Sequence, residues 1–491
     1  MQRLISLLEG VTTITDIALD VPVQSVSADS RHIWPGSAFV AIPGLTEDGS
    51  FYIPDAIKRG AAVVISNGGS IADRSIEVKT PLIRVDDPRK ALSRIAANFY
   101  GHPSKELTIV GITGTNGKTT VSYLLDSIFE KHELQTGVVG TLGIHAPGME
   151  AQSILTTPDS LDLQKTLRLL ADGNVTHVVM EVSSHALQLS RVEDVEFDVA
   201  VYTNLSQDHL DFHGTMDNYF EAKARLFQML PADCVAILNR SDARFDRLKN
   251  LTDAKIASYA VDSDADIFFQ EWGMSGAGIT GIIRMEDEKV SINSPLIGVH
   301  NLENILAAAT TAWSMDIPTD IIGRGIEACI SVPGRSERFL LQNGASVIVD
   351  YAHTPDAYHK LFSSLRTLLP ISGKLIVIFG CGGDRDHDKR PLMAEAAEAY
   401  ANRILVTPDN PRTESIDSIN EDIAAGFKED RHTFYDDRAV AIRQAVKELQ
   451  EGDILAVVGK GRENCQLIGT ERIPYSDIEV VEKITEEKQA K

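Results

Sequence analysis

A glycine-rich loop between an apolar run and an amphipathic pattern, in Leu107–His132, constrains the fold of this chain more than any other stretch. The residues before the loop are apolar, and the apolar residues after it recur at helical spacing. A buried strand that turns through this loop into a helix is therefore expected. Glycines let backbone N–H groups approach a phosphate closely, and a helix N-terminus carries a partial positive charge. The stretch predicts a phosphate-binding loop formed by Gly114, Thr115, Asn116, Gly117, Lys118, Thr119 and Thr120.

Two side chains of this loop have predicted roles in binding ATP and Mg²⁺. Lys118 is placed to reach the β- and γ-phosphates, and the hydroxyl of Thr119 is placed to hold Mg²⁺. The spacing departs from the common P-loop pattern, because Ile112 stands where the first glycine of that pattern would fall. We interpret the loop as a compact variant. The alternative is a turn whose glycines occur by chance, and the strand before it and the helix after it disfavour that reading.

The composition limits the classes of protein to consider. A length of 491 residues is enough for about three domains. The net charge of −23 argues against binding nucleic acid through a broad basic surface. The four cysteines lie far apart without the spacing of a metal site, so we expect reduced thiols and a cytoplasmic protein. The N-terminal residues lack the pattern of a signal peptide, and no apolar run is long enough to span a membrane.

Gly and Pro residues at two junctions divide the chain into three expected domains, of residues 1–101, 102–332 and 333–491. The first domain is expected to be mixed α/β. In the second, apolar runs that alternate with helical segments imply a parallel sheet of the P-loop type. The third shows the pattern of a Rossmann-like sheet. The expected fold class is therefore α/β, and ligands should bind beyond the carboxyl ends of the parallel strands.

Polar residues that follow the central strands are candidates for binding a metal or a nucleotide. Glu181 is a suitable oxygen ligand for Mg²⁺, whereas a residue such as His209 is ordinarily a hydrogen-bonding histidine. Taken alone, Lys223 has the pattern of a surface lysine on a helix. Asn301 and Asn304 begin a predicted helix, where asparagine usually caps, and a contact with adenine is the minority alternative.

The last third of the chain repeats one pattern four times: a buried strand followed by a Gly- or Pro-containing turn rich in charge. At the junction before it, Arg335 is placed to clamp a nucleotide. Arg385 and Arg412 are suited to bind a carboxylate through paired hydrogen bonds, and nearby Asp and Glu side chains would accept an ammonium group. The four turns together predict a pocket for an amino acid.

Two classes of protein combine an ATP site, a Mg²⁺ site and an amino-acid pocket. One is an ATP-dependent ligase that joins a carboxylate to an amine. The other is a P-loop ATPase or GTPase switch with a ligand-sensing domain. A switch should have an apolar strand of the Walker B type that ends in Asp, which we do not find, so the ligase is favoured. A nucleotide-sugar-binding regulator without chemistry is a weaker third alternative.

Eleven motifs between residues 113 and 463 resemble those of the Mur ligases and occur in the same order. They are TGTNGKTT, TTPDS, EVSSHAL, TNLSQDHLDFH, YFEAKARLF, GVHNLENILAA, VPGRSERF, DYAHTPDA, GCGGDRD, DNPR and GKGRE. Within the family, DNPR is similar to the form that adds meso-diaminopimelate to UDP-N-acetylmuramoyl-L-alanyl-D-glutamate in peptidoglycan synthesis. The resemblance therefore implies these two substrates together with ATP.

The resemblance also implies roles that spacing alone does not give. Lys223 matches a lysine that CO₂ converts to a carbamate (N6-carboxylysine), which with Thr119, Glu181 and His209 helps bind Mg²⁺. Lys118, Lys223, His209 and Glu181 would thus be catalytic, and Asn301, Asn304 and Arg335 would contact the nucleotide. Contacts with the UDP-sugar dipeptide are implied for Ser30, Thr156, Thr157, Ser183 and Arg191. The diaminopimelate pocket would contain Arg385, Asp409, Asn410, Arg412, Gly459 and Glu463.

The reaction implied by the resemblance has two steps. The D-glutamyl γ-carboxylate attacks the γ-phosphate of ATP, and the amine then attacks the acyl phosphate. The first domain would bind the uridine end of the substrate, and the protein is expected to be a monomer. The chain departs from the family pattern at Arg462, where a histidine is usual. A divergent copy that adds L-lysine or another amino acid therefore stays open as an alternative.

Overall fold

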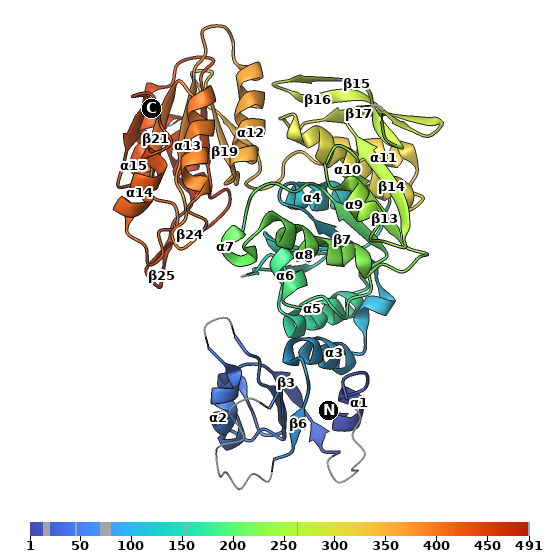
Figure 1. The fold of residues 1–491 in the computed structure, drawn as a ribbon. Helices are drawn as coiled ribbons and strands as arrows, with labels where there is room; N and C mark the ends of the chain where they lie inside the picture. Colours follow the sequence, from blue (N-terminus) through green and yellow to red (C-terminus); the bar gives the residue numbers. More distant parts are fainter. Residues whose placement is uncertain (13–19, 45–46, 69–79, 154, 263, 490–491) are drawn as a thin grey trace. The chain divides into compact units, whose positions relative to one another are not determined.

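The computed structural model describes residues 1–12, 20–44, 47–68, 80–153, 155–262 and 264–489. The chain forms two compact units. The first unit comprises Met1–Gly111, Leu134–Ala200 and Gln228–Cys234. The second comprises Ile112–Glu133, Val201–Phe227 and Val235–Lys491. Figure 1 colours both units by sequence, from blue at the N-terminus to red at the C-terminus.

The N-terminal part of the first unit is a small parallel sheet covered by helices. Its four strands lie in the order β3-β4-β5-β6, and each neighbouring pair is parallel. Apolar side chains of β4 and β5 are fully buried, which explains why both short runs form inner strands. The elements are β1 (Gln2–Arg3), α1 (Leu4–Leu7), β2 (Pro22–Val23), β3 (Ser25–Ser27), β4 (Ser37–Val40), α2 (Ile53–Lys58), β5 (Val63–Ser66), β6 (Leu82–Arg84) and α3 (Pro88–Tyr100).

The rest of the first unit is built on five strands in the order β10-β9-β8-β11-β7. Strand β11 pairs with β8 in parallel, and β8, β9 and β10 form antiparallel pairs. Helix α3 packs against α5, and Arg94 forms an ion pair of 2.7 Å with Asp194. The elements are β7 (Thr108–Thr113), β8 (Thr136–Gly140), β9 (Gly143–Ala146), β10 (Met149–Ala151), α5 (Ser160–Asp172), β11 (His177–Glu181) and α6 (Ser184–Gln188).

The second unit begins within β7 and continues into the helix after the glycine-rich loop. Strands follow in the order β12-β13-β14-β15-β16-β17, of which the last three form an antiparallel meander. Helix α4 packs against α10 and α11. The elements are α4 (Lys118–Lys131), β12 (Val199–Tyr202), α7 (Leu210–His213), α8 (Met216–Gln228), β13 (Val235–Asn239), α9 (Phe245–Lys249), β14 (Lys255–Ala260), β15 (Ile267–Ser275), β16 (Gly278–Met285), β17 (Glu288–Ser294), α10 (His300–Ser314) and α11 (Thr319–Ala328).

The C-terminal part of the second unit, orange to red in Figure 1, is a sheet in the order β18-β19-β23-β20-β21-β22. All pairs are parallel except the one made by the edge strand β18. Its elements are β18 (Glu337–Leu340), β19 (Ser346–Asp350), α12 (Pro355–Leu368), β20 (Leu375–Phe379), α13 (Lys389–Tyr400), β21 (Arg403–Val406), α14 (Ile416–Ala424), β22 (His432–Phe434), α15 (Arg438–Glu448), β23 (Ile454–Val458), β24 (Cys465–Ile468), β25 (Glu471–Pro474) and α16 (Asp477–Gln489).

Helices cover both faces of this sheet. Val377 and Phe379 of β20 point into a core with α12, α13 and α14, whereas Ile376 and Ile378 point into a core with α15 and α16. Because successive side chains of a strand alternate between faces, a strand buried on both sides must be apolar throughout. The predicted α/β class with parallel sheets and a Rossmann-like C-terminal part is thus confirmed.

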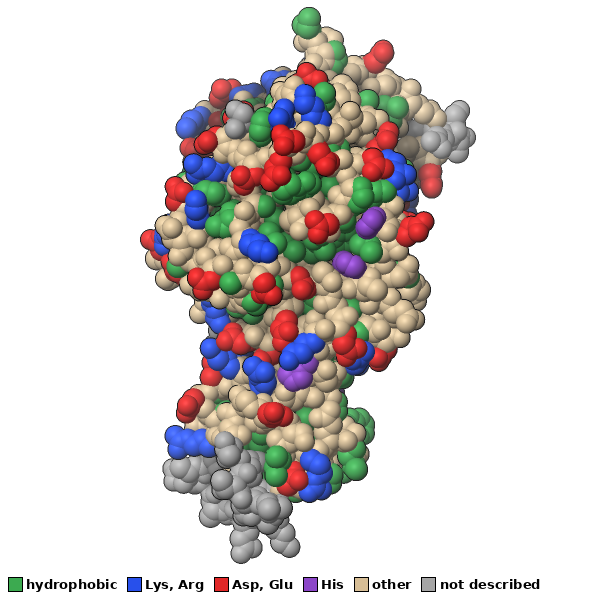
Figure 2. Space-filling view, turned by 90° about the vertical axis from the view of Figure 1, so that its right-hand side faces the viewer, with side chains coloured by type: hydrophobic (Ala, Val, Ile, Leu, Met, Phe, Trp, Pro, Cys, Tyr) green, Lys and Arg blue, Asp and Glu red, His purple; other side chains and the backbone are tan. Residues whose placement is uncertain are grey.

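The surface matches the acidic composition. On the face drawn in Figure 2, Lys and Arg side chains lie among Asp and Glu side chains, with hydrophobic groups between them. Among the described residues, no helix combines the length and the apolar character that are needed to cross a membrane.

Candidate nucleotide and amino-acid sites

The glycine-rich loop joins β7 to α4 as predicted, and its glycines are required by the backbone and by close neighbours. Gly114 has φ +150° and Gly117 has φ +89°, conformations that favour glycine. A Cβ atom at Gly114 would collide with the hydroxyl of Thr203, and one at Gly117 with the side-chain oxygen of Asn304. The loop is therefore held against the end of β12 and the start of α10.

Residues after β12 fix the conformation of the loop through hydrogen bonds. The backbone N–H of Thr115 donates to the carbonyl of Asn204 (2.8 Å), and that of Asn116 donates to the Asn204 side-chain oxygen (3.0 Å). The Thr203 hydroxyl donates to the Asn116 carbonyl (2.6 Å). The shape of the loop is thus set by a partner segment nearly ninety residues further along the chain.

Lys118 and Thr119 begin helix α4, as the sequence predicts. The Lys118 ammonium donates to the carbonyls of Gly114 (2.8 Å) and Thr115 (3.0 Å), so it folds over the loop. The buried hydroxyl of Thr119 accepts a hydrogen bond from Arg335 (3.0 Å). Arg335 also stacks over the ring of Tyr351, 4.5 Å from its centroid. Arg335 thus lies beside the glycine-rich loop, and its contact with a nucleotide stays a prediction.

Lys223 does not lie on the surface, and the expectation drawn from its pattern alone is wrong. It is 1% exposed on α8, because this face of the amphipathic helix packs inward together with Tyr219 and Phe220. Its Nζ donates to the carbonyl of Gly114 (2.8 Å) and lies 4.5 Å from the centroid of the Tyr219 ring. Burial, reinforced by the charge of Lys118, lowers the pKa of Lys223 well below its usual range, which favours the neutral amine over the ammonium form.

Asp208 forms a buried charge cluster beside His209. It accepts a hydrogen bond from Lys389 (3.1 Å), and its other oxygen lies 3.4 Å from the Nε2 of His209 and 3.5 Å from that of His353. Burial alone would raise the pKa of Asp208, but His353, Lys389 and His209 outweigh it and hold the pKa well below its usual range. The side chain of His209 is 38% exposed, and its ring lies edge-to-face against that of Tyr219.

Glu181 ends β11 in the first unit and is buried. One of its oxygens accepts from the Thr141 N–H (2.9 Å) and the other from the Thr141 hydroxyl (3.0 Å). The Thr156 hydroxyl lies 3.1 Å from that of Thr141, and the Thr157 hydroxyl donates to the Glu181 carbonyl (2.8 Å). The N–H of Ser183 donates to the Thr157 hydroxyl (3.0 Å). The structure therefore brings together Glu181 and three residues predicted to bind the UDP-sugar dipeptide.

Two further residues predicted to bind that substrate lie in the same unit. Arg191 donates to the Thr157 carbonyl (3.2 Å) and pairs with Asp159 (2.9 Å), which ties it to the same group of residues. Ser30 is buried in the 3-10 turn Ser30–His32 after β3, and the side chain of Asp29 caps this turn.

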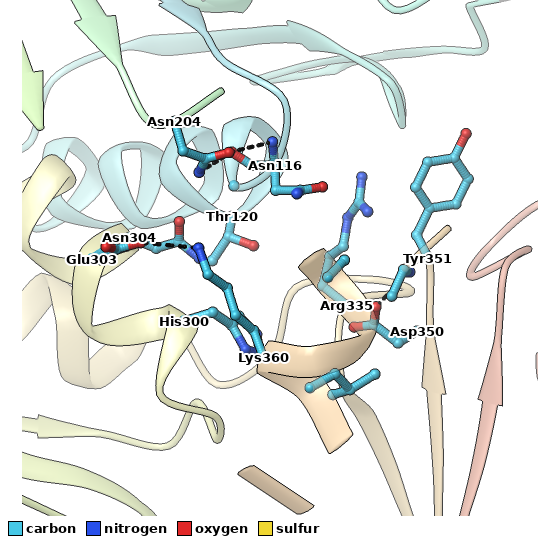
Figure 3. A pocket seen from close by; sticks show the side chains of 14 residues that line it. Asn116, Thr120, Asn204, His300, Glu303, Asn304, Arg335, Asp350, Tyr351 and Lys360 are labelled. Carbon is cyan, nitrogen blue, oxygen red and sulfur yellow. Dashed lines mark hydrogen bonds and ion pairs between the residues drawn. The ribbon is translucent and has the colours of Figure 1, made fainter. Parts of the chain in front are cut away.

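A cavity adjoins the glycine-rich loop (Figure 3). Asn304 lines it, whereas Asn301 lies behind and accepts a hydrogen bond from the Asn304 amide (2.8 Å). The expectation that these asparagines cap the helix is wrong, because Val299 is the N-cap and the Asn301 amide instead donates to the Ile297 carbonyl. The lining residues are Asn116, Gly117, Thr120, Asn204, His300, Glu303, Asn304, Arg335, Asp350, Tyr351, Ala352, Ala357, Lys360 and Leu361.

Of the lining residues, Glu303 and Lys360 were not singled out from the sequence, whereas Asp350 belongs to the first of the four charged turns. Asp350 ends β19 and accepts from the backbone N–H groups of Ser336 (2.5 Å) and Ala352 (2.6 Å), which fixes the turn into the cavity. Lys360 reaches Glu303 at 3.7 Å, as the dashed line in Figure 3 shows. The motif GVHNLENILAA contains Glu303, so a closer reading of this motif could have found it.

The predicted amino-acid residues meet where β21 and β23 end. The fully buried ammonium of Lys460 donates to Glu463 (2.7 Å) and to Asn410 (3.1 Å), and it lies 3.9 Å from Asp409. Gly459 has φ +112°, and a Cβ there would lie 2.7 Å from a carboxylate oxygen of Asp409. Burial raises the pKa of Asp409 although Lys460 opposes this. Lys460 was not predicted as part of the pocket.

The two predicted carboxylate-binding arginines approach the same place. Arg412 is half-buried with φ +53°, and it donates to the carbonyl of Gly383 (2.8 Å). Burial lowers the pKa of Arg412, and the charge of the exposed Arg385 lowers it further. Arg462, which departs from the family pattern, points elsewhere: its side chain is half-exposed and lies 3.8 Å from Glu337.

Comparison with known proteins places three family models along the chain. The model of the Mur ligase family, catalytic domain, matches residues 22–100. The Mur ligase middle domain matches residues 112–312, and the Mur ligase, glutamate ligase domain, matches residues 334–461.

Curated proteins and solved structures agree with these models. A UDP-N-acetylmuramoyl-L-alanyl-D-glutamate--2,6-diaminopimelate ligase of Nostoc sp. is 39% identical over 98% of this chain and 97% of its own. A protein of that name from Synechococcus elongatus is 40% identical over 96% of each chain. A solved structure of such a ligase is 32% identical, covers 95% of this chain and 96% of its own, and has a TM-score of 0.67. MurF ligase from Thermotoga maritima, at 16% identity and a TM-score of 0.64, shares the fold. The chain belongs to the Mur ligase family.

Proposed function

We propose that this protein is an ATP-dependent ligase that adds meso-diaminopimelate to the D-glutamate of UDP-N-acetylmuramoyl-L-alanyl-D-glutamate in peptidoglycan synthesis. The observation that carries the proposal is its identity of 37–40% to curated ligases of that name over nearly the whole chain. The pocket around Asp409, Asn410 and Arg412 supports it, since it offers groups that can bind an ammonium and a carboxylate.

ATP is the nucleotide that we assign to the second unit. Backbone N–H groups at the start of α4 and the ammonium of Lys118 suit its phosphates. The cavity beside them, with Asn304 backed by Asn301, suits the base, and Arg335 lies between the two. Lys118 must leave the carbonyls that it now contacts in order to reach a phosphate.

The donor groups near the loop fit Mg²⁺, which prefers oxygen ligands and keeps several waters. The Thr119 hydroxyl and His209 would hold it in the second unit, and Glu181 in the first unit stays a predicted ligand. When bound, the ion would neutralise charge on the phosphates. We also propose that Lys223, converted to its carbamate, is an anionic ligand of the ion. Burial lowers the pKa of its amine, which favours the neutral form, and a neutral amine adds to CO₂ and releases one proton to give a carbamate.

The amino-acid pocket has matched charges. Arg412, with Arg385 near it, would bind a carboxylate through paired hydrogen bonds. Asp409 and Glu463 would accept an ammonium group, and Lys460 already balances one of their two charges. One carboxylate and one ammonium suit the free end of diaminopimelate, which carries both groups, better than the side chain of L-lysine, which carries only the ammonium.

The proposed reaction proceeds in two steps. A γ-carboxylate oxygen attacks the γ-phosphorus of ATP, the bond to ADP breaks, and an acyl phosphate forms. The neutral amine of diaminopimelate then attacks the acyl carbon, and phosphate leaves as the amide forms. Lys118 stabilises the charge that spreads over the transferred group in the first step. Thr156, Thr157, Ser183, Arg191 and Ser30 stay the predicted contacts of the UDP-sugar dipeptide.

We further propose three domains, of residues 1–101, 102–332 and 333–491. The three family models match within these limits, which supports the division. The cytoplasm is the proposed location, because the four cysteines are free and ATP is a substrate. A monomer is the predicted state.

A phosphate-release assay with the purified full chain, ATP, Mg²⁺ and the dipeptide substrate tests the proposal. Phosphate release should depend on the added amino acid, and meso-diaminopimelate should support it far better than L-lysine. Equal rates with both would refute the assigned specificity and favour a divergent ligase. Release that needs no amino acid would instead indicate an ATPase switch.

A further inference from the structure

The hairpin β24–β25 lies directly after the loop that carries Glu463, and beyond the segment that the C-terminal family model matches, which ends at residue 461. Its outer strand β25 is exposed along its whole length. Its inner strand β24 instead contacts the segment after β21, residues 408–412. The hairpin is therefore attached to the segment 408–412, which carries residues of the predicted amino-acid pocket.

Gln466 forms the first connection. Its side-chain amide donates to the carbonyls of Pro408 (3.1 Å) and Asp409 (3.0 Å). A donor that bridges two successive carbonyls fixes the peptide plane between them. The Asp409 carboxylate lies on that segment, so its direction depends on the Gln466 amide.

Leu467 forms the second connection through its backbone. Its N–H donates to the side-chain oxygen of Asn410 (3.0 Å), which also accepts from Lys460 (3.1 Å). With its oxygen occupied by two donors, the Asn410 amide must present its NH₂ group to the opposite side, where it donates to Glu463 (2.9 Å). The hairpin thus selects one of the two orientations of this amide.

Arg412 is held by the third connection. Its N–H donates to the Leu467 carbonyl (2.9 Å), and its carbonyl accepts from the N–H of Gly469 (2.7 Å). This residue has φ +53°, a conformation that L-residues other than Asn and Asp rarely adopt. Such a backbone persists where surrounding contacts impose it. The hairpin provides those contacts.

We propose that the β24–β25 hairpin is the positioning element of the amino-acid pocket, and that Gln466 is its principal positioning residue. The hairpin fixes Asp409, Asn410 and Arg412 in the arrangement that recognises the ammonium and carboxylate of the incoming amino acid. This inference rests on the proposed function for the identity of the ligand. The hydrogen bonds themselves do not depend on it.

The variant Gln466→Met tests the inference in the full chain, because it keeps the length of the side chain and removes its donor. The KM for meso-diaminopimelate should rise roughly tenfold, as expected for two lost hydrogen bonds, while the KM for ATP stays within about twofold. Gln466→Lys restores a donor and should recover most of the loss. Arg472→Gln, on the exposed strand of the same hairpin, is the matched control and should change neither KM.

A second variant covers the case in which Gln466→Met does not fold. Gly469 has φ +58° and space around it, so Gly469→Ala strains the backbone at the hydrogen bond to Arg412 without a steric clash. It should raise the KM for the amino acid and leave the KM for ATP nearly unchanged. An unchanged KM for the amino acid in whichever of the two variants folds, or an equal rise of both KM values, would overturn the inference.

Hydrogen–deuterium exchange separates this inference from the proposed function. The backbone amides of Asp409, Asn410, Arg412 and Thr413 should exchange faster in Gln466→Met than in the unaltered chain, and not in Arg472→Gln. If the unaltered chain released no phosphate with any amino acid, the proposed function would fail, and the exchange would still report on positioning. Unchanged exchange in Gln466→Met would refute the positioning role itself.

Discussion

Lys223 shows how a single residue can be misjudged from its neighbours in the sequence. A lysine on an amphipathic helix is normally solvated, yet this one is 1% exposed and its amine contacts the carbonyl of Gly114. A buried amine with a strongly lowered pKa is a costly feature to retain without a chemical use. Its position at the phosphate loop points to a role in the reaction.

We expect Lys223→Ala to lose nearly all ligase activity, because the variant cannot form the carbamate. Short carboxylic acids such as acetate should restore part of the activity by supplying an anion in the space left by the side chain. Phosphate release measured with and without acetate checks this. Lys249→Ala, which removes an exposed lysine of α9, should keep full activity. Full activity of Lys223→Ala would rule out the carbamate.

For single residues, the sequence indicated the position of the loop residues better than the burial and the contacts of residues elsewhere. Lys118 and Thr119 follow from local spacing, because a strand, a glycine-rich loop and a helix are neighbours in the chain. Asn301 was expected to be a helix cap, and its amide instead supports Asn304 from behind. The burial of Lys460 at the pocket depends on contacts between two loops, the one that carries Asp409 and Asn410 and the one that carries Glu463, and no local pattern indicates it.

At the scale of elements, a buried arginine joins the two loops that carry Arg385 and Arg412. Arg390, fully buried on α13, donates to the carbonyl of Gly382 (3.0 Å) and forms two hydrogen bonds of 2.7 Å with Glu414. These bonds, with smaller contributions from neighbouring groups, lower the pKa of Glu414 to about 2. The ionised form of this carboxyl group is therefore the form that stabilises the fold.

The direction of the resulting pH dependence follows from the lowered pKa. The contribution of Glu414 is complete above the pKa of an unfolded glutamate, about 4.3, and is lost as the pH falls towards 2. Glu414→Gln should lower the melting temperature at pH 7 and should reduce the further loss between about pH 4.5 and pH 2. Thermal unfolding at several pH values measures both effects. Glu421→Gln, an exposed position on α14, is the control and should follow the unaltered chain.

The elements themselves were predictable where the pattern is local. The four apolar runs of the last third became β19, β20, β21 and β23, since a strand covered on both faces must be continuously apolar. Their strand order was not predictable, because β23 lies between β19 and β20 although it comes last of the four in the sequence. That order decides which loops become neighbours, and hence which charged residues share a pocket.

For the molecule as a whole, the cavity beside the phosphate loop illustrates what only the folded chain can show. Its walls come from four segments, around residues 116–120, 204, 300–304 and 335–361, which lie far apart in the sequence. Each segment carries a recognisable motif, but their convergence on one cavity is a tertiary property. The proposed phosphate half of the nucleotide site was therefore predictable from one stretch, whereas the convergence of the other segments on one cavity was not.

Binding of a whole nucleotide should stabilise the folded chain, because a ligand that binds only the native state shifts the unfolding equilibrium. At a concentration of 100 times Kd the gain is about 2.7 kcal/mol. A non-hydrolysable ATP analogue with Mg²⁺ should therefore raise the melting temperature, whereas adenosine, which lacks the phosphates, should have a much smaller effect at the same concentration. Lys118→Ala should remove most of the shift with the analogue, and Lys249→Ala should keep it. If adenosine raised the melting temperature as much as the analogue, the phosphate loop would contribute no binding energy. The division of the site into a loop for the phosphates and a cavity for the base would then be wrong.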